Sequence, residues 1–160
     1  MSIIFLKPPD DRIVVWGQSC SGKTTFSLQL DNHYYCFDAL FKWHIIETLC
    51  LSTDRCLLNA VDQIKHEKFV LDGWHLSDKT GKLLPNNVSC YLIYAEYEQI
   101  ISQYRALVVT KDQYWLMFKE WYCFVNYENL PGIRYFFNNG DNFIETEQNS
   151  FNEFVSRINV

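Results

Sequence analysis

A short glycine-containing segment near the start of the chain constrains the fold most strongly. Residues 17–24 read Gly-Gln-Ser-Cys-Ser-Gly-Lys-Thr, which fits the pattern G-x-x-x-x-G-K-[ST]. An apolar, β-branched run at 12–16 precedes the segment and is typical of a buried strand. The residues that follow, 25–30, are typical of an opening helix. A strand, a glycine loop and a helix in this order predict a unit of a parallel α/β sheet.

The same segment predicts a phosphate-binding loop of the Walker A type. Glycines at its two ends permit backbone angles that let successive N–H groups turn inward around a triphosphate. A Gly/Ser surface loop matching by chance is the alternative, but both flanks fit the strand and the helix. The residues predicted to bind nucleotide here are Gly17, Ser19, Cys20, Ser21, Gly22, Lys23, Thr24 and Thr25. Within this set we expect Lys23 to reach the β- and γ-phosphates and the Thr24 hydroxyl to hold Mg²⁺.

Composition limits the class of protein. A length of 160 residues predicts a single domain over 1–160. The net charge of −5 argues against broad electrostatic binding to duplex nucleic acid, although a local basic cleft stays open. An aromatic content of 17% indicates either a Tyr- and Phe-rich core, which we favour, or an exposed platform that stacks a base.

Hydropathy and cysteine spacing favour a cytoplasmic protein. The apolar run 2–6 is too short for a signal peptide or a membrane span, so we expect no membrane partner. The six cysteines form no C-x-x-C pair. This spacing favours buried free thiols in a reducing compartment over a disulfide framework or a zinc site.

Strand and helix patterns alternate along the chain. Apolar runs predict strands at 12–16, 34–37, 68–71, 90–94 and 133–137. Helical patterns lie at 40–66, with a break and a new helix cap at 52–54, and at 96–107, 111–127 and 148–158. Alternation of this kind predicts an α/β three-layer sandwich, with a parallel sheet of about five strands and helices on both faces.

Two acids end predicted strands, where ligands bind in such sheets. Asp72 is expected to hold Mg²⁺ opposite Thr24, and its alternative is a plain Asp-Gly turn. Asp38 follows the strand after the phosphate loop, where a carboxylate can orient an acceptor hydroxyl and take its proton. An N-cap for the segment that begins at Ala39 is the alternative for Asp38.

Several cations are candidates for binding charged groups. Arg105, near the end of the helix after the fourth strand, is predicted to stabilise the charge that develops during phosphoryl transfer, with Lys111 as the second candidate. Lys42 and Arg55 are candidates on the acceptor side. Each of these residues also fits an ordinary solvated surface position.

Residues just past the third strand are candidates for an acceptor pocket. Gly73 lets the backbone pass close to a ligand. Trp74 and His75 follow it and are expected to line the pocket, although Trp74 also fits a core position.

Taken together, these motifs resemble the P-loop kinase group, which includes nucleoside, nucleotide and other small-molecule kinases and polynucleotide 5′-kinases. The resemblance is carried by 17–25, Asp38, 70–73, Arg105 and 133–141. It implies the sheet order 2-3-1-4-5, an acceptor acid at the second strand end, arginines on a lid, and a loop after the fifth strand that packs on adenine. Asn138 and Asn139 match that last loop and are predicted to bind nucleotide.

The sequence also departs from this group. Nucleoside-monophosphate kinases usually carry an arginine three residues after the acceptor-site acid, whereas Phe41 and then Lys42 stand here. A hydroxyl acceptor on a nucleoside, a small metabolite or a nucleic-acid 5′ end therefore fits as well as a monophosphate.

The sequence thus predicts a phosphotransferase that uses ATP and Mg²⁺ on a nucleoside, nucleotide or related small acceptor. Lys23, Asp38 and Arg105 are its predicted catalytic residues. The alternatives are a nucleotide-binding ATPase or GTPase switch, a regulatory P-loop module and a polynucleotide 5′-hydroxyl kinase. A homodimer is left open, and a nucleic-acid partner is not favoured.

Overall fold

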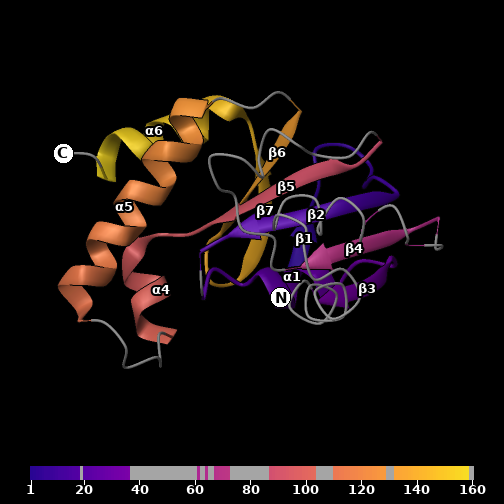
Figure 1. Ribbon diagram of the computed structural model, residues 1–160, viewed down its shortest axis with the longest axis horizontal. Helices are drawn as coiled ribbons and strands as arrows, with labels where there is room; N and C mark the ends of the chain where they lie inside the picture. The colour runs from indigo at the N-terminus through magenta and orange to yellow at the C-terminus, as the bar shows by residue number, and fades with distance from the viewer. Residues whose placement is uncertain are drawn as a thin grey trace, which may run out of the picture.

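The computed structural model describes residues 1–18, 20–36, 61, 64, 67–72, 87–103, 110–128 and 132–158. The predicted helical segment 40–66 lies outside these residues except at Val61 and Ile64, both of which are buried. In the described part of the chain, the strands form one mixed sheet, and helices pack against it (Figure 1).

The sheet has seven described strands in the order β1-β7-β6-β5-β2-β4-β3. Their bounds are Ser2–Ile4 (β1), Arg12–Gly17 (β2), His33–Cys36 (β3), Phe69–Asp72 (β4), Ser89–Tyr94 (β5), Ile133–Asn138 (β6) and Asn142–Thr146 (β7). The five predicted strands correspond to β2 to β6. They are parallel and lie in the order 2-3-1-4-5, which the resemblance implied.

The prediction of a parallel sheet of about five strands is corrected by β1 and β7. Strand β7 pairs antiparallel with β6, because the three residues between Asn138 and Asn142 are too few for a parallel crossover. Strand β1 then pairs parallel with β7, with Ser2 opposite Asn142. The sheet is therefore mixed, and both additional strands lie beyond β6.

Helices cover both faces of the sheet, as predicted. Helix α1 (Lys23–Leu28) lies on one face, and α4 (Tyr97–Gln103), α5 (Lys111–Glu128) and α6 (Gln148–Ile158) lie together on the other (Figure 1). Alternation along β2 divides the core accordingly: Ile13 and Val15 pack with Phe26 of α1, whereas Val14 and Trp16 belong to the cluster under α4 to α6.

Aromatic side chains fill much of this core. On the side of α4 to α6, the fully or almost fully buried rings include Trp16, Phe69, Phe118, Tyr122, Phe151 and Phe154, from β2, β4, α5 and α6. The exposed large apolar side chains of the described residues are all aliphatic or methionine. In the described chain the aromatic content therefore serves mainly as core.

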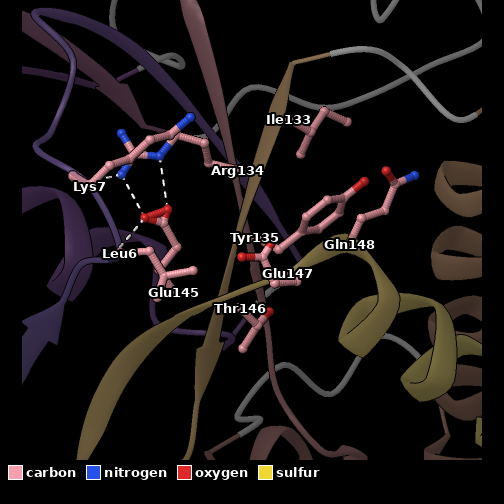
Figure 2. A pocket seen from close by; sticks show the side chains of 9 residues that line it. All are labelled: Leu6, Lys7, Ile133, Arg134, Tyr135, Glu145, Thr146, Glu147 and Gln148. Carbon is pink, nitrogen blue, oxygen red and sulfur yellow. Dashed lines mark hydrogen bonds and ion pairs between the residues drawn. The ribbon is translucent and has the colours of Figure 1, made fainter.

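Arg134 of β6 ties the segment between β1 and β2 to the sheet. Its guanidinium makes a two-pronged ion pair with Glu145 of β7, at 2.9 and 2.6 Å (Figure 2). The guanidinium donates to the carbonyl oxygens of Lys7 and Pro8 as well. It also contacts Asp10 at 3.1 Å. Burial disfavours the charged form of Asp10, but hydrogen bonds from Tyr91 and Arg134 outweigh it, and the pKa of Asp10 lies below its ordinary value.

A cavity of about 420 Å³ lies beside this cluster, where β6 begins and β7 ends (Figure 2). This is the amino-terminal end of the parallel strands. The phosphate loop follows β2 at the opposite, carboxyl end. The Figure 2 cavity is thus separate from the predicted nucleotide site.

None of the helices that the structure describes has the length and apolar character needed to cross a membrane. The four described cysteines are free thiols, but Cys36 is exposed, so the expectation of buried thiols holds for Cys90 and is wrong for Cys36. Cys36 lies on β3, which is at the edge of the sheet that the described strands form and has β4 as its neighbour there.

Candidate nucleotide site

The two glycines of the phosphate loop are sterically required. Gly17 is buried at the end of β2, and a Cβ there would lie 2.6 Å from Ser21 Oγ and 2.8 Å from the carbonyl oxygen of Ile93. Gly22 has a φ of 97°, in the left-handed region that side chains disfavour. The chain can therefore turn tightly between β2 and α1 only with glycine at these positions.

The loop between the two glycines is held by its own backbone. The N–H of Ser21 donates to the carbonyl oxygen of Gln18 at 3.1 Å, and Cys20 takes a left-handed φ of 67°. Ser21 is fully buried, and its Oγ has no hydrogen-bond partner among the described residues. A strained residue and an unsatisfied hydroxyl in one short loop are features that cluster at functional sites.

The first turn of α1 is connected to the end of β4. The Thr24 hydroxyl donates to Oδ2 of Asp72 at 2.7 Å. The two residues meet because β2 and β4 are neighbouring strands, with Val15 opposite Asp72, so both strands end at the same edge. The predicted pair of metal-binding residues is thus within direct contact, although 48 residues separate them in sequence.

Tyr34 joins this pair and was not predicted. Its hydroxyl donates to the same Oδ2 atom of Asp72 at 2.9 Å. Burial, followed by the hydrogen bond and the charge of Asp72, raises the pKa of Tyr34 to about 12, so the hydroxyl keeps its proton. Tyr34 pairs with Val70 in the register of β3 and β4, which places it on the same face as Asp72 two residues further along β4.

This set of groups fits Mg²⁺. Asp72 is only 5% exposed, and both hydroxyls that contact it are neutral. Because the Thr24 hydroxyl donates a hydrogen bond to the carboxylate, the lone pairs of its oxygen stay free for a cation. Carboxylate and hydroxyl oxygens are ligands that Mg²⁺ prefers.

Asn138 and Asn139 both bond within the protein. Asn138 is 3% exposed, and its Nδ2 donates to the carbonyl oxygen of Ser21 at 2.9 Å. Its Oδ1 accepts from Gln99 Nε2 and from the N–H of Gly140. Oδ1 of exposed Asn139 accepts from the two following N–H groups of the β6–β7 turn, at 141 and 142.

The structure places the other predicted residues unevenly. Lys23 begins α1 and Thr25 follows in its first turn, so both lie at the loop, whereas Lys111 is exposed at the start of α5. The last residue of α4, Gln103, reaches the loop, because its carbonyl oxygen accepts from Cys20 Sγ at 3.5 Å. The predicted residues outside the described part of the chain are Ser19, Asp38, Lys42, Arg55, Gly73, Trp74, His75 and Arg105.

The sheet contains a five-stranded parallel core in the order 2-3-1-4-5, with a glycine loop after the central strand and an acid at the end of the neighbouring strand. This arrangement is the fold of the P-loop kinases. A search of solved structures agrees with this fold. The chain is similar to shikimate kinase from Aquifex aeolicus vf5, with a TM-score of 0.52 and 18% sequence identity, and the match covers 92% of each chain. No protein-family model and no curated protein sequence matches the chain.

Proposed function

We propose that this chain, as a single domain, is an ATP- and Mg²⁺-dependent phosphotransferase that phosphorylates a hydroxyl group of a small molecule. The observation that carries the proposal is the 2.7 Å hydrogen bond between Thr24 of the phosphate loop and Asp72 at the end of β4. A loop that only resembled a phosphate-binding loop would not need a buried acid at this place. In a P-loop enzyme, these two residues hold the metal that neutralises the phosphates.

The residues take the following roles in the proposed reaction. Lys23 neutralises the β- and γ-phosphates, and Thr24 and Asp72 hold Mg²⁺, which supplies further charge neutralisation when it is bound. Asp38 orients the acceptor hydroxyl and takes its proton as the oxygen bonds to the γ-phosphorus and ADP leaves. Arg105 or Lys111 offsets the charge that develops on the transferred group.

A hydroxyl acceptor is favoured over a monophosphate. The segment after Asp38 lacks the arginine that a monophosphate acceptor usually requires. The solved structure with the same fold is named as a kinase of shikimate, a small molecule. We therefore place small hydroxyl compounds ahead of nucleotides and of nucleic-acid 5′ ends.

The proposal is tested by incubating the purified protein with γ-labelled ATP, Mg²⁺ and separate acceptor pools. The pools are nucleosides, hydroxyl-bearing metabolites that include shikimate, deoxynucleoside monophosphates, and 5′-hydroxyl oligonucleotides. Label on the nucleoside or metabolite pool supports the proposal, and label on oligonucleotides alone would indicate a polynucleotide kinase. Label released only as free phosphate would indicate a hydrolytic switch.

Two variants and a matched control assign the activity to this site. Lys23→Ala is expected to lower transfer by about 10²–10³-fold, because it removes a charge that stabilises the transition state. Lys68→Ala removes an exposed lysine near Asp11, at the other end of the sheet, and is expected to leave transfer unchanged. Asp38→Asn is expected to abolish transfer and to spare ATP binding.

A further inference from the structure

Asn138 contacts the phosphate loop although it belongs to a strand that is not next to β2. Strand β5 lies between β2 and β6 in the sheet. At the carboxyl edge of the sheet, the Asn138 side chain meets the loop that follows β2 and donates from Nδ2 to the carbonyl oxygen of Ser21 at 2.9 Å. This contact links residues that are 117 positions apart in sequence.

Two further hydrogen bonds fix the orientation of the Asn138 amide. Gln99 of α4 donates to Oδ1 at 2.9 Å, and the N–H of Gly140 donates to the same atom at 3.0 Å. Because Oδ1 accepts both bonds, the amide group cannot flip without losing them. Nδ2 is therefore held toward Ser21.

The bond to Ser21 also sets the direction of the next N–H group. No cis peptide bond occurs among the described residues, so the Ser21–Gly22 peptide is planar and trans. In a trans peptide, the C=O and the N–H point in opposite directions. Holding the Ser21 carbonyl toward Asn138 therefore points the Gly22 N–H away from it.

Packing at Gly22 supports a specific contact. A Cβ at Gly22 would lie 2.9 Å from Asn138 Nδ2 and 3.0 Å from two ring atoms of Phe143. The second glycine of the loop is thus needed for the approach of Asn138 as well as for its left-handed φ of 97°. Asn138 and Gly22 fit together as one unit.

We propose that Asn138 is a positioning residue for the phosphate chain of the nucleotide, because it holds the Ser21–Gly22 peptide so that the Gly22 N–H is aimed at a phosphate oxygen. The inference rests on the proposed function and assigns a different role from the contact with adenine that the resemblance implies. The Asn138 side chain is buried, and both of its polar atoms bond within the protein. Its effect on the nucleotide is exerted through the loop backbone.

The test compares a probe that has a base with a probe that has none. Binding of ATP and of inorganic tripolyphosphate is measured by calorimetry at one Mg²⁺ concentration, for the wild type, Asn138→Asp and Asn138→Ala. The Asp variant keeps Oδ1 for Gln99 and Gly140 but loses the donor to Ser21, and the Ala variant removes the donor without adding charge. We expect both variants to bind both probes about tenfold more weakly, because an N–H bond to a charged group would be misdirected.

A control variant separates positioning from loss of stability. Asn32 Nδ2 also holds backbone carbonyl oxygens, those of Asp10, Asp11 and Phe69, at the opposite end of the sheet. Asn32→Ala is expected to lower the thermal unfolding midpoint and to leave the binding of both probes unchanged. If the Asn138 variants do not fold, Gln99→Leu removes one of the bonds that orient Asn138, and weaker binding of both probes is again expected.

The outcomes distinguish the inference from the proposed function. Weaker binding of ATP with unchanged binding of tripolyphosphate would show that Asn138 acts on the base, and would overturn the inference. Unchanged binding of both probes would overturn it as well, while the proposed function would stand. A wild type that binds neither probe would overturn the proposed function and the inference together.

Discussion

Replacing Arg134 by methionine is expected to cost about 4–5 kcal/mol of unfolding free energy. The side chains of Arg134 and Glu145 are only 7% and 4% exposed, and two hydrogen bonds of 2.9 and 2.6 Å join them. The N–H of Leu6 also donates to Glu145, at 3.1 Å. Without the guanidinium, the Glu145 carboxylate would stay buried with this N–H as its remaining donor among the described residues. Breaking a buried ion pair by removing one partner costs about 3–5 kcal/mol. We expect the upper part of this range, because the carbonyl oxygens of Lys7 and Pro8 also lose a donor.

The assay is equilibrium unfolding in urea, followed by circular dichroism. With a slope of about 2 kcal/mol per molar urea, a cost of 4 kcal/mol lowers the midpoint by about 2 M. The double variant Arg134→Met/Glu145→Met is expected to recover most of the loss, because no buried carboxylate is left unpaired and Asp10, the other partner of Arg134, is 40% exposed. Arg157→Met is the matched control: Arg157 is 62% exposed and pairs with Glu96 at 3.0 Å, so its replacement should cost less than about 1 kcal/mol.

Two results would refute this reasoning. A cost for Arg134→Met no larger than that of Arg157→Met would mean that burial does not strengthen the pair. A double variant no more stable than Arg134→Met would mean that the loss of unfolding free energy in Arg134→Met comes from packing around the arginine and not from the unpaired carboxylate of Glu145.

Three further outcomes are expected. Tyr34→Phe removes a donor to the predicted metal ligand Asp72 and should weaken the Mg²⁺ dependence of ATP binding by about tenfold, as measured by calorimetry over a range of Mg²⁺ concentrations. Because the pKa of Asp10 is lowered in the folded state, ionised Asp10 stabilises the fold at any pH above the ordinary carboxyl pKa. This stabilisation is lost as the pH falls through the lowered pKa. Urea midpoints measured from pH 6 to pH 2 should therefore fall less steeply in Asp10→Asn than in the wild type. Cys20 has a left-handed φ of 67°, which glycine adopts readily and a β-branched residue resists. Cys20→Gly should therefore raise the thermal unfolding midpoint, and Cys20→Val should lower it.

The part of the site that is encoded locally could be predicted from sequence. The phosphate loop is one continuous segment, so its pattern and its two flanks were sufficient to place it between β2 and α1. Asp72 could be placed as well, because an acid at the end of an apolar run becomes a residue at the carboxyl edge as soon as the sheet is parallel. The hydrogen bond between Thr24 and Asp72 agrees with both inferences.

The remaining features depend on contacts that leave no local pattern. Strand β7 contributes only Phe143 and Ile144 as apolar residues, and β1 has three residues, so neither gives a strong periodic signal. The position of Tyr34 beside Asp72 depends on the register between β3 and β4, which sequence periodicity alone does not fix. The bond from Asn138 to the phosphate loop needs the complete order of the strands.

The pairing of β1 with β7 has a consequence for the order of folding. Ser2 and Asn142 are hydrogen-bonded across a separation of 140 residues, so forming this contact closes a very long loop. During translation, β1 is made before the other described strands, and β7, its neighbour in the described sheet, follows about 140 residues later. Contacts of such high sequence separation form slowly, because the entropy of the intervening chain opposes them. We therefore expect β1 to be among the last of the described strands to join the sheet, although it precedes the others in sequence.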